Sequence, residues 1–379
     1  MRAAPCRVGV CMTLDARTDA PADLFSPITV GDLQLANRIT MAPLTRTRAD
    51  ERGVHGELAV EYYRQRASVG LIVSEGTYPL QESKAFPGQP GIETDEQVAA
   101  WRTVTDAVHA DGGLIFLQLM HSGRVSHTDV NGTSRVVGPS AIAIDGEVRT
   151  PTGKQPFPVP HALTLDEIET TKAAMVAGAR NAIRAGFDGV EIHSANGYLL
   201  HEFLSPASNV RDDQYGGSPE NRARFVIEVT KAVAEAIGAG RTGIRISPEH
   251  NIQGALETDA DDVRATYGAL LDGIGGLGLA YLSVLHQDLG GELVQGLRAR
   301  FDGVLIGNTG FGVVTTRDVA QAALTHADAV AVGRPLIANP DLVARWATGA
   351  PENTPDPSTF YGSTAEGYID YPTLVSASA

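Results

Sequence analysis

Eight short apolar runs, separated mostly by helical patterns, constrain the fold of this chain more than any other feature. Each run is nearly continuous in Ile, Val, Leu and Ala, which is typical of parallel strands that are buried on both faces. The runs lie at residues 38–43, 71–77, 114–121, 189–195, 243–248, 280–286, 303–308 and 329–334. This alternation of strands and helices predicts an α/β fold.

The segments between the runs carry helix start signals. Thr164 is followed three residues later by Glu167, which is the spacing of a capping box. Ser218 precedes Pro219, as an N-cap residue often precedes a proline at the first helical position. Eight such strand-and-helix units predict a single (β/α)₈ TIM barrel. A doubly wound parallel sheet is the alternative, because one sequence does not fix the strand count.

Two segments fall outside this regular pattern. Residues 122–163 are too many for a simple loop and are rich in Gly, Pro, Ser and Thr, so we expect an insertion after the third strand that covers the mouth of the barrel. Residues 1–22 lack the apolar stretch of a signal peptide and predict a flexible N-terminal extension. Residues 23–375 would then form one barrel domain.

Charge and cysteine content exclude several classes of protein. The formal net charge is −15, which argues against binding nucleic acid or an anionic membrane. No run of eighteen apolar residues is present, so no membrane span is expected. Cys6 and Cys11 are the only cysteines, too few for a disulfide framework or an iron–sulfur cluster. We therefore expect a cytoplasmic protein without a metal site.

Polar residues follow most of the apolar runs, where a barrel of this kind has its active site. Any one of them could be an ordinary buried amide or a paired arginine, but so many at one end of successive strands predict a ligand site. Glycines near the last two strand ends, together with an arginine, would suit a phosphate group. The polar residues at the strand ends are Thr45, Glu75, Gln118, His121, His193, Asn196, Arg245, His286, Asn308 and Arg334.

The stretch "HSANGYLLHEFLSPASNVRDDQYGGSPENRARF" at 193–225 resembles the Old Yellow Enzyme family of flavin-dependent ene-reductases. "NRITMAPLTRTRA", "RPLIANPDLVARW" and the tail "FYGSTAEGYIDYPTL" extend the resemblance over roughly residues 24–374. Within the family, the chain is most similar to bacterial reductases that act on N-ethylmaleimide, nitrate esters and enones. The resemblance implies a barrel that binds FMN non-covalently and takes NADPH or NADH as reductant, as a monomer or a homodimer.

The resemblance also implies which residues bind the cofactor. The Thr45 hydroxyl would bond the flavin O4, and Gln118 and Arg245 would face its pyrimidine edge. Arg245 would also stabilise the negative charge of the reduced flavin. The phosphate cradle would contain Thr309, Gly310, Gly333 and Arg334. The full set implied for FMN is Pro43, Leu44, Thr45, Gly76, Gln118, Arg245, Thr309, Gly310, Gly333 and Arg334.

The family's catalytic residues correspond to three positions near 193–198. His193 and Asn196 would bind the carbonyl oxygen of an α,β-unsaturated substrate, and Tyr198 would protonate its carbon. Nitroester or nitroaromatic reduction is the alternative main role, because it needs the same oxygen-binding pair but not Tyr198. Phe86, Met120 and Tyr361 would also contact substrate; relatives usually carry a tyrosine in place of the first and an aromatic residue in place of the second.

Overall fold

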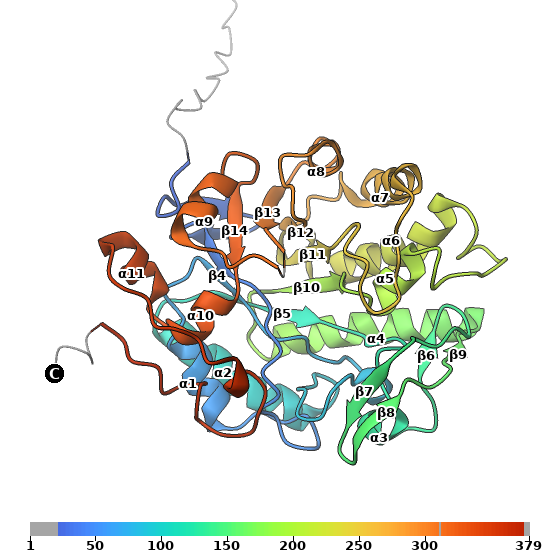
Figure 1. Ribbon diagram of the computed structural model, residues 1–379, viewed down its shortest axis with the longest axis horizontal. Coiled ribbons are helices and arrows are strands. Elements are labelled where there is room, and N and C mark those ends of the chain that lie inside the picture. Colours follow the sequence, from blue (N-terminus) through green and yellow to red (C-terminus); the bar gives the residue numbers. More distant parts are fainter. Residues whose placement is uncertain (1–21, 311, 375–379) are drawn as a thin grey trace, which may run out of the picture.

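The fold is built around a closed barrel of parallel strands (Figure 1). The computed structural model describes residues 22–310 and 312–374, so Cys6, Cys11 and residues 1–21 of the expected extension lie outside the described residues. Each of the eight apolar runs contains one barrel strand, and the predicted TIM barrel is confirmed. Around the barrel the strands are β3 (Ile39–Met41), β4 (Leu71–Val73), β5 (Ile115–Leu119), β10 (Gly189–Ser194), β11 (Thr242–Ile246), β12 (Tyr281–Leu285), β13 (Val304–Asn308) and β14 (Ala329–Val332).

Helices surround the barrel and bury their apolar faces against the outward side chains of the strands (Figure 1). Thr164 and Glu167 form the predicted capping box of α4, and Ser218 caps α6 with Pro219 at its first position. No helix among the described residues has the length and apolarity needed to cross a membrane. The helices are α1 (Glu57–Arg64), α2 (Asp95–Ala110), α4 (Leu165–Arg184), α5 (Leu199–Leu204), α6 (Pro219–Ile237), α7 (Ala260–Ile274), α8 (Glu292–Arg298), α9 (Arg317–Ala323), α10 (Arg334–Ala338) and α11 (Leu342–Thr348), with three short 3₁₀ helices at Gln81–Ser83, Ala239–Arg241 and Pro357–Thr359.

Side chains alternate between the helix layer and the inside of the barrel, as they must along a strand. In β5, Leu117 and Leu119 belong to the core under the helices, whereas Phe116 belongs to a separate core inside the barrel. The antiparallel hairpin of β1 (Ile28–Val30) and β2 (Leu33–Leu35) adds Val30 and Leu35 to this inner core. In its turn, the backbone N–H of Asp32 donates to the carbonyl of Gly240, which lies just before β11. The hairpin therefore closes the N-terminal end of the barrel. The opposite end is left for a ligand.

The run at 71–77 forms a shorter strand than expected. Strand β4 ends at Val73, and Glu75 lies beyond it with its carboxylate fully buried. Its Oε2 accepts hydrogen bonds from the backbone N–H groups of Arg46 (2.9 Å) and Thr47 (3.2 Å). The side chain therefore serves the loop after β3, and burial raises its pKa to about 7 despite these bonds.

The insertion at 122–163 folds into small elements beside the C-terminal end of the barrel. Residues Asp129, Val130, Arg149 and Pro151 from this segment line the cavity at that end, as the sequence predicts. The hairpin of β7 and β8 carries two of them. The elements are α3 (Thr128–Asn131), β6 (Val137–Gly138), β7 (Glu147–Thr150), β8 (Gly153–Pro156) and β9 (His161–Ala162).

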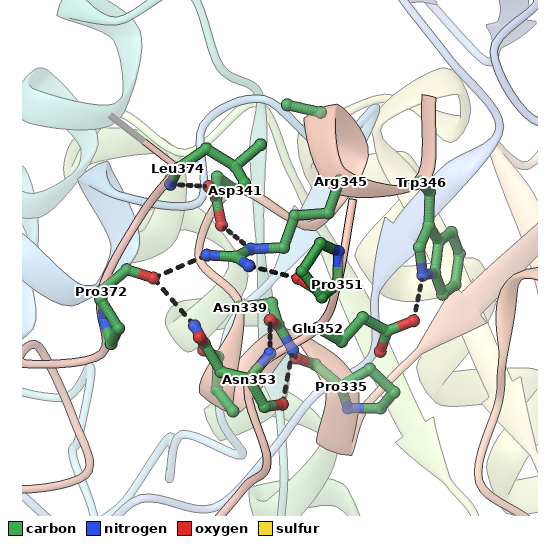
Figure 2. A network of polar contacts seen from close by, with 12 residues as sticks. Pro335, Asn339, Asp341, Arg345, Trp346, Pro351, Glu352, Asn353, Pro372 and Leu374 are labelled. Carbon is green, nitrogen blue, oxygen red and sulfur yellow. Dashed lines mark hydrogen bonds and ion pairs between the residues drawn. The ribbon is translucent and has the colours of Figure 1, made fainter. Parts of the chain in front are cut away.

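A polar clamp fastens the C-terminal segment to α11 (Figure 2). Arg345 of α11 donates to the carbonyls of Pro351 and Pro372, and its Nε bonds the Asp341 carboxylate at 2.7 Å. Asn353 also donates to the Pro372 carbonyl, at 2.8 Å. Both ends of the intervening segment are therefore held at one guanidinium group.

Candidate active site

A cavity of about 1340 Å³ opens at the C-terminal ends of the strands. Most residues implied by the family resemblance meet on its wall. Thr309 does not contribute to the wall, and its hydroxyl lies 3.3 Å from that of Thr315. The predicted residues on the wall are Pro43, Leu44, Thr45, Gly76, Phe86, Gln118, Met120, His193, Asn196, Tyr198, Arg245, Gly310, Gly333, Arg334 and Tyr361.

Three of the polar strand-end residues point elsewhere, namely Glu75, which is described above, and two histidines. His121 and His286 follow β5 and β12 at positions that alternate with the inward side chains, so both lie outside the cavity wall. The Nδ1 atom of His121 accepts from the Gly123 N–H at 3.1 Å, and burial lowers its pKa to about 3. His286 lies 3.3 Å from the Glu249 carboxylate. These two histidines, like Glu75, support loops and do not face the ligand.

The floor of the cavity combines an amide, a guanidinium and a carboxylate. Gln118 donates to Glu191 at 2.7 Å, and Tyr281 donates to the other oxygen of Glu191 at 3.1 Å. Burial raises the pKa of Glu191, while the nearby Arg245 opposes this shift. Arg245 bonds Ser283 at 3.1 Å, but its Nε is buried without a partner. A ligand that offers acceptor atoms or negative charge here would satisfy this group.

Glycine at position 76 lets backbone border the cavity. A Cβ added to Gly76 would lie 2.6 Å from the Met120 sulfur and 3.4 Å from the Gln118 Oε1 atom. Any side chain would therefore displace the Met120 sulfur. Gly333 likewise lies on the cavity wall with no side chain, directly before the exposed Arg334. The site thus has flat backbone surfaces together with polar groups, which suits a planar ligand that carries a phosphate.

His193, Asn196 and Tyr198 lie together above this floor. The rings of His193 and Tyr198 have centroids 5.2 Å apart, and the Phe86 ring meets Tyr198 edge-on at 6.5 Å. His193 Nδ1 and Asn196 Oδ1 are both buried without a hydrogen-bond partner. Burial, the charge of Arg245 and nearby His201 all lower the pKa of His193, so the ring is neutral at pH 7. Burial raises the pKa of Tyr198 to about 12, which keeps its hydroxyl protonated.

The loop after β11 adds two wall residues that the sequence patterns do not identify. Ile252 and Gln253 line the cavity, and the Gln253 amide donates to the Asn196 carbonyl at 2.6 Å. A hydrogen bond from Gln253 also lowers the pKa of Tyr198, although burial dominates. The only local signal is the polar stretch "EHNIQG" that follows the end of this strand.

Comparison with known proteins identifies the family of this chain. Residues 23–353 match the family model described as the NADH:flavin oxidoreductase / NADH oxidase family. The chain belongs to this family. Among curated members of the NADH:flavin oxidoreductase family, the probable flavin mononucleotide-dependent alkene reductase of Leishmania infantum is 42% identical over 360 residues, which cover 92% of this chain and 97% of that protein.

Solved structures of NADH:flavin oxidoreductases share the architecture. The Old Yellow Enzyme homologue from Zymomonas mobilis is 43% identical with a TM-score of 0.87, covering 93% of this chain and 99% of that one. Morphinone reductase is 44% identical with a TM-score of 0.88, covering 95% and 98%. A second morphinone reductase structure, in complex with tetrahydroNAD, is 45% identical with a TM-score of 0.86. The match covers 93% of this chain and 97% of that one. The chain is thus an NAD(P)H-dependent FMN oxidoreductase of the Old Yellow Enzyme family, and the predicted ene-reductase class is confirmed.

Proposed function

We propose that the enzyme reduces the activated C=C bonds of α,β-unsaturated carbonyl compounds, with Tyr198 as the proton donor. The observation that carries this proposal is the buried Nδ1 atom of His193, which has no partner, beside the Tyr198 ring and on the same cavity wall as the Asn196 amide. Buried polar groups are rarely left unpaired, so these side chains call for a polar atom of a ligand. A carbonyl oxygen would accept from the His193 ring N–H and from the Asn196 amide N–H, while the Asn196 Oδ1 atom would still need a donor.

Bound FMN supplies the hydride for this reaction. The partnerless Nε of Arg245 and the inward-facing Gln118 amide support placing the pyrimidine edge of FMN at the cavity floor. Arg334, which is exposed on the cavity wall just after β14, would bind its phosphate. Thr309 stays a prediction from the resemblance alone. The residues we assign to FMN are Pro43, Leu44, Thr45, Gly76, Gln118, Arg245, Thr309, Gly310, Gly333 and Arg334.

His193 and Asn196 would then act as oxyanion donors. Hydride addition to an activated alkene moves negative charge onto the carbonyl oxygen, so donors fixed at that point stabilise the transition state more than the ground state. Because its pKa is lowered by burial, the neutral His193 ring keeps one N–H and one unprotonated nitrogen. The protein thus polarises the substrate without transferring a proton to its oxygen.

Tyr198 would complete the reaction by protonating the neighbouring carbon. Its pKa is raised to about 12, mainly by burial, so the acid form predominates at neutral pH. Gln253 reduces this shift through a hydrogen bond, which would stabilise the phenolate left after proton transfer. Tyr198 lies beside His193, so its proton is near a substrate whose oxygen occupies the donor pair.

A substrate panel tests this function against the nitroester or nitroaromatic alternative. The purified protein should be yellow, release FMN on heating, and oxidise NADPH or NADH in the presence of cyclic enones and maleimides. We expect enones to be reduced at the C=C bond, which product analysis by gas chromatography would verify. Turnover of nitrate esters and nitroaromatics together with inert enones would instead favour the alternative role, for which Tyr198 is not needed.

Met120 is predicted to control the size of substrate that the site accepts. It is buried on the cavity wall with its sulfur against Gly76, and an unbranched thioether can adopt several shapes. In Met120→Trp, we expect kcat/KM to fall for cyclic enones with large substituents and to be kept for 2-cyclohexen-1-one. Steady-state assays on a graded series would measure this. A uniform decrease across the series would show that this side chain does not limit the pocket.

A further inference from the structure

The turn that connects β10 to Tyr198 has an unfavourable backbone conformation. Asn196 and Gly197 have φ angles of 59° and 78°, in the left-handed region that most side chains avoid. A Cβ on Gly197 would also lie 2.7 Å from the Ile252 carbonyl oxygen. Because Asn196 and Tyr198 flank Gly197, this turn determines where both functional side chains point. Such a conformation persists only when the surrounding structure holds it.

Side chains from three segments bind the peptide groups of the turn. Ser247 accepts from the Asn196 N–H at 2.8 Å, and Gln253 donates to the Asn196 carbonyl at 2.6 Å. His201 Nδ1 accepts from the Gly197 N–H at 2.8 Å. His201 differs from Gln253 because it is fully buried in α5 and is not part of the cavity wall. His201 therefore contacts the turn from outside the cavity wall.

Glu257 lies beside the second ring nitrogen of His201. When Nδ1 accepts a hydrogen bond, the neutral imidazole carries its hydrogen on Nε2. The Nε2 atom lies 3.2 Å from Oε1 of Glu257 without a well-directed hydrogen bond, and both side chains are buried. A carboxylate in this position favours the tautomer that leaves Nδ1 free to accept, as carboxylates do behind metal-bound histidines.

Glu257 also connects the turn to two other parts of the site. Its Oε1 accepts from the Tyr267 hydroxyl of α7 at 3.0 Å, and its Oε2 accepts from the Glu249 N–H at 2.8 Å. Glu249 begins the loop that carries Ile252 and Gln253 into the cavity. One buried carboxylate therefore ties the turn, the loop after β11 and helix α7 together.

We propose that His201 and Glu257 are positioning residues for Asn196 and Tyr198, acting through the Gly197 peptide. The inference rests on the proposed function, because it takes Asn196 as an oxyanion donor and Tyr198 as the acid. Without an acceptor at His201 Nδ1, the Gly197 N–H would be left unpaired in the interior. The turn would then relax from its left-handed form and displace both side chains from the substrate.

Two substitutions at His201 separate positioning from simple packing. Asparagine places an oxygen close to where Nδ1 lies and can accept from Gly197, whereas phenylalanine fills the volume without an acceptor. We expect His201→Phe to slow alkene reduction by the reduced enzyme about 10- to 100-fold, the range expected when reacting groups shift slightly. It should also weaken phenol binding to the oxidised enzyme, measured by spectral titration. His201→Asn should restore most of both losses.

Glu257→Gln is a second test if His201→Phe does not fold, and we expect losses in the same two measurements. Glu202→Gln is the matched control. Glu202 follows His201 directly in α5 and, like His201, is fully buried. Its Oε1 accepts from the Arg124 N–H at 2.9 Å and has no bond to the turn. Burial raises the pKa of Glu202 to about 8, so a neutral amide resembles its form at pH 7. This control should behave as the parent enzyme.

Equal losses in His201→Phe and His201→Asn would overturn the proposal, and so would parental values in His201→Phe or Glu257→Gln. Failure of the proposed function would look different. If Tyr198→Phe reduces enones at the parental rate, Tyr198 is not the acid. The difference in phenol affinity between the two His201 variants would still report whether Asn196 is positioned by this network.

Discussion

Replacing Tyr198 with phenylalanine is expected to slow the reduction of 2-cyclohexen-1-one about 10²–10⁴-fold, the usual contribution of general acid catalysis. Reduction of the flavin by NADPH or NADH needs no acid from the protein and should keep its parental rate. The two half-reactions can be followed separately by anaerobic stopped-flow absorbance of the flavin. Because the pKa of Tyr198 is about 12, the parent keeps its acid throughout the neutral range.

Tyr215→Phe is a suitable control for this variant. Tyr215 is buried, and its hydroxyl donates to Glu228 at 3.0 Å. Its ring packs against Phe203 and Phe225, away from the cavity wall. It should leave both half-reactions unchanged. A Tyr198→Phe enzyme that loses rate equally in both halves would instead indicate damaged binding, and the assignment of Tyr198 as proton donor would be wrong.

The second large effect is expected at His193. Removing one donor from an oxyanion site typically costs about 10²–10³-fold in rate, so His193→Ala should slow enone reduction by that amount. Phenols offer an independent measurement, since a donor to the phenolate oxygen favours the ionised form and lowers the pKa of the bound phenol. We expect phenols to give a long-wavelength charge-transfer band with the parent enzyme. The alanine variant should lose most of this band.

His121→Asn is the corresponding control, because His121 is also a buried histidine after a barrel strand but faces away from the cavity. The asparagine oxygen can replace Nδ1 as the acceptor for the Gly123 N–H. Enone reduction and the phenol band should be retained. Parental phenol affinity in His193→Ala would exclude this residue as an oxyanion donor, whatever the result at His121.

The barrel could be predicted from the sequence because each of its strands is a nearly continuous apolar run. The residue at which each strand ends is harder to predict from the sequence. The run at 71–77 gives only Leu71–Val73, since Glu75 leaves the strand to bond the loop after β3. The alternation of side chains along a strand also predicts which strand-end residues face the cavity. Residues 116, 118 and 120 point inward along and beyond β5, and this excludes His121.

Contacts between distant segments could not be predicted in the same way. Gln253 reaches Asn196 across 57 positions of the chain, and Glu257 reaches His201 across a similar separation. Nothing in the local sequence pairs them, because the hydrogen bonds depend on how the loop after β11 folds back over β10. The family resemblance supplies the catalytic turn itself, whereas the residues behind it become visible only in three dimensions.

The clamp at Arg345 makes part of the C-terminal segment an exchangeable module. Pro351 and Pro372 meet at a single guanidinium group (Figure 2). Tyr361, which lies between them in the sequence, is on the cavity wall. Closing a loop costs little more as it lengthens, by about 0.6 kcal/mol for each doubling. Segments of different length and sequence could therefore replace the exposed residues 361–363, provided that the Phe360 and Gly367 carbonyls that bind Arg46 and the buried Tyr368 ring are kept. The rim of the pocket can thus be diversified separately from the chemistry on its floor.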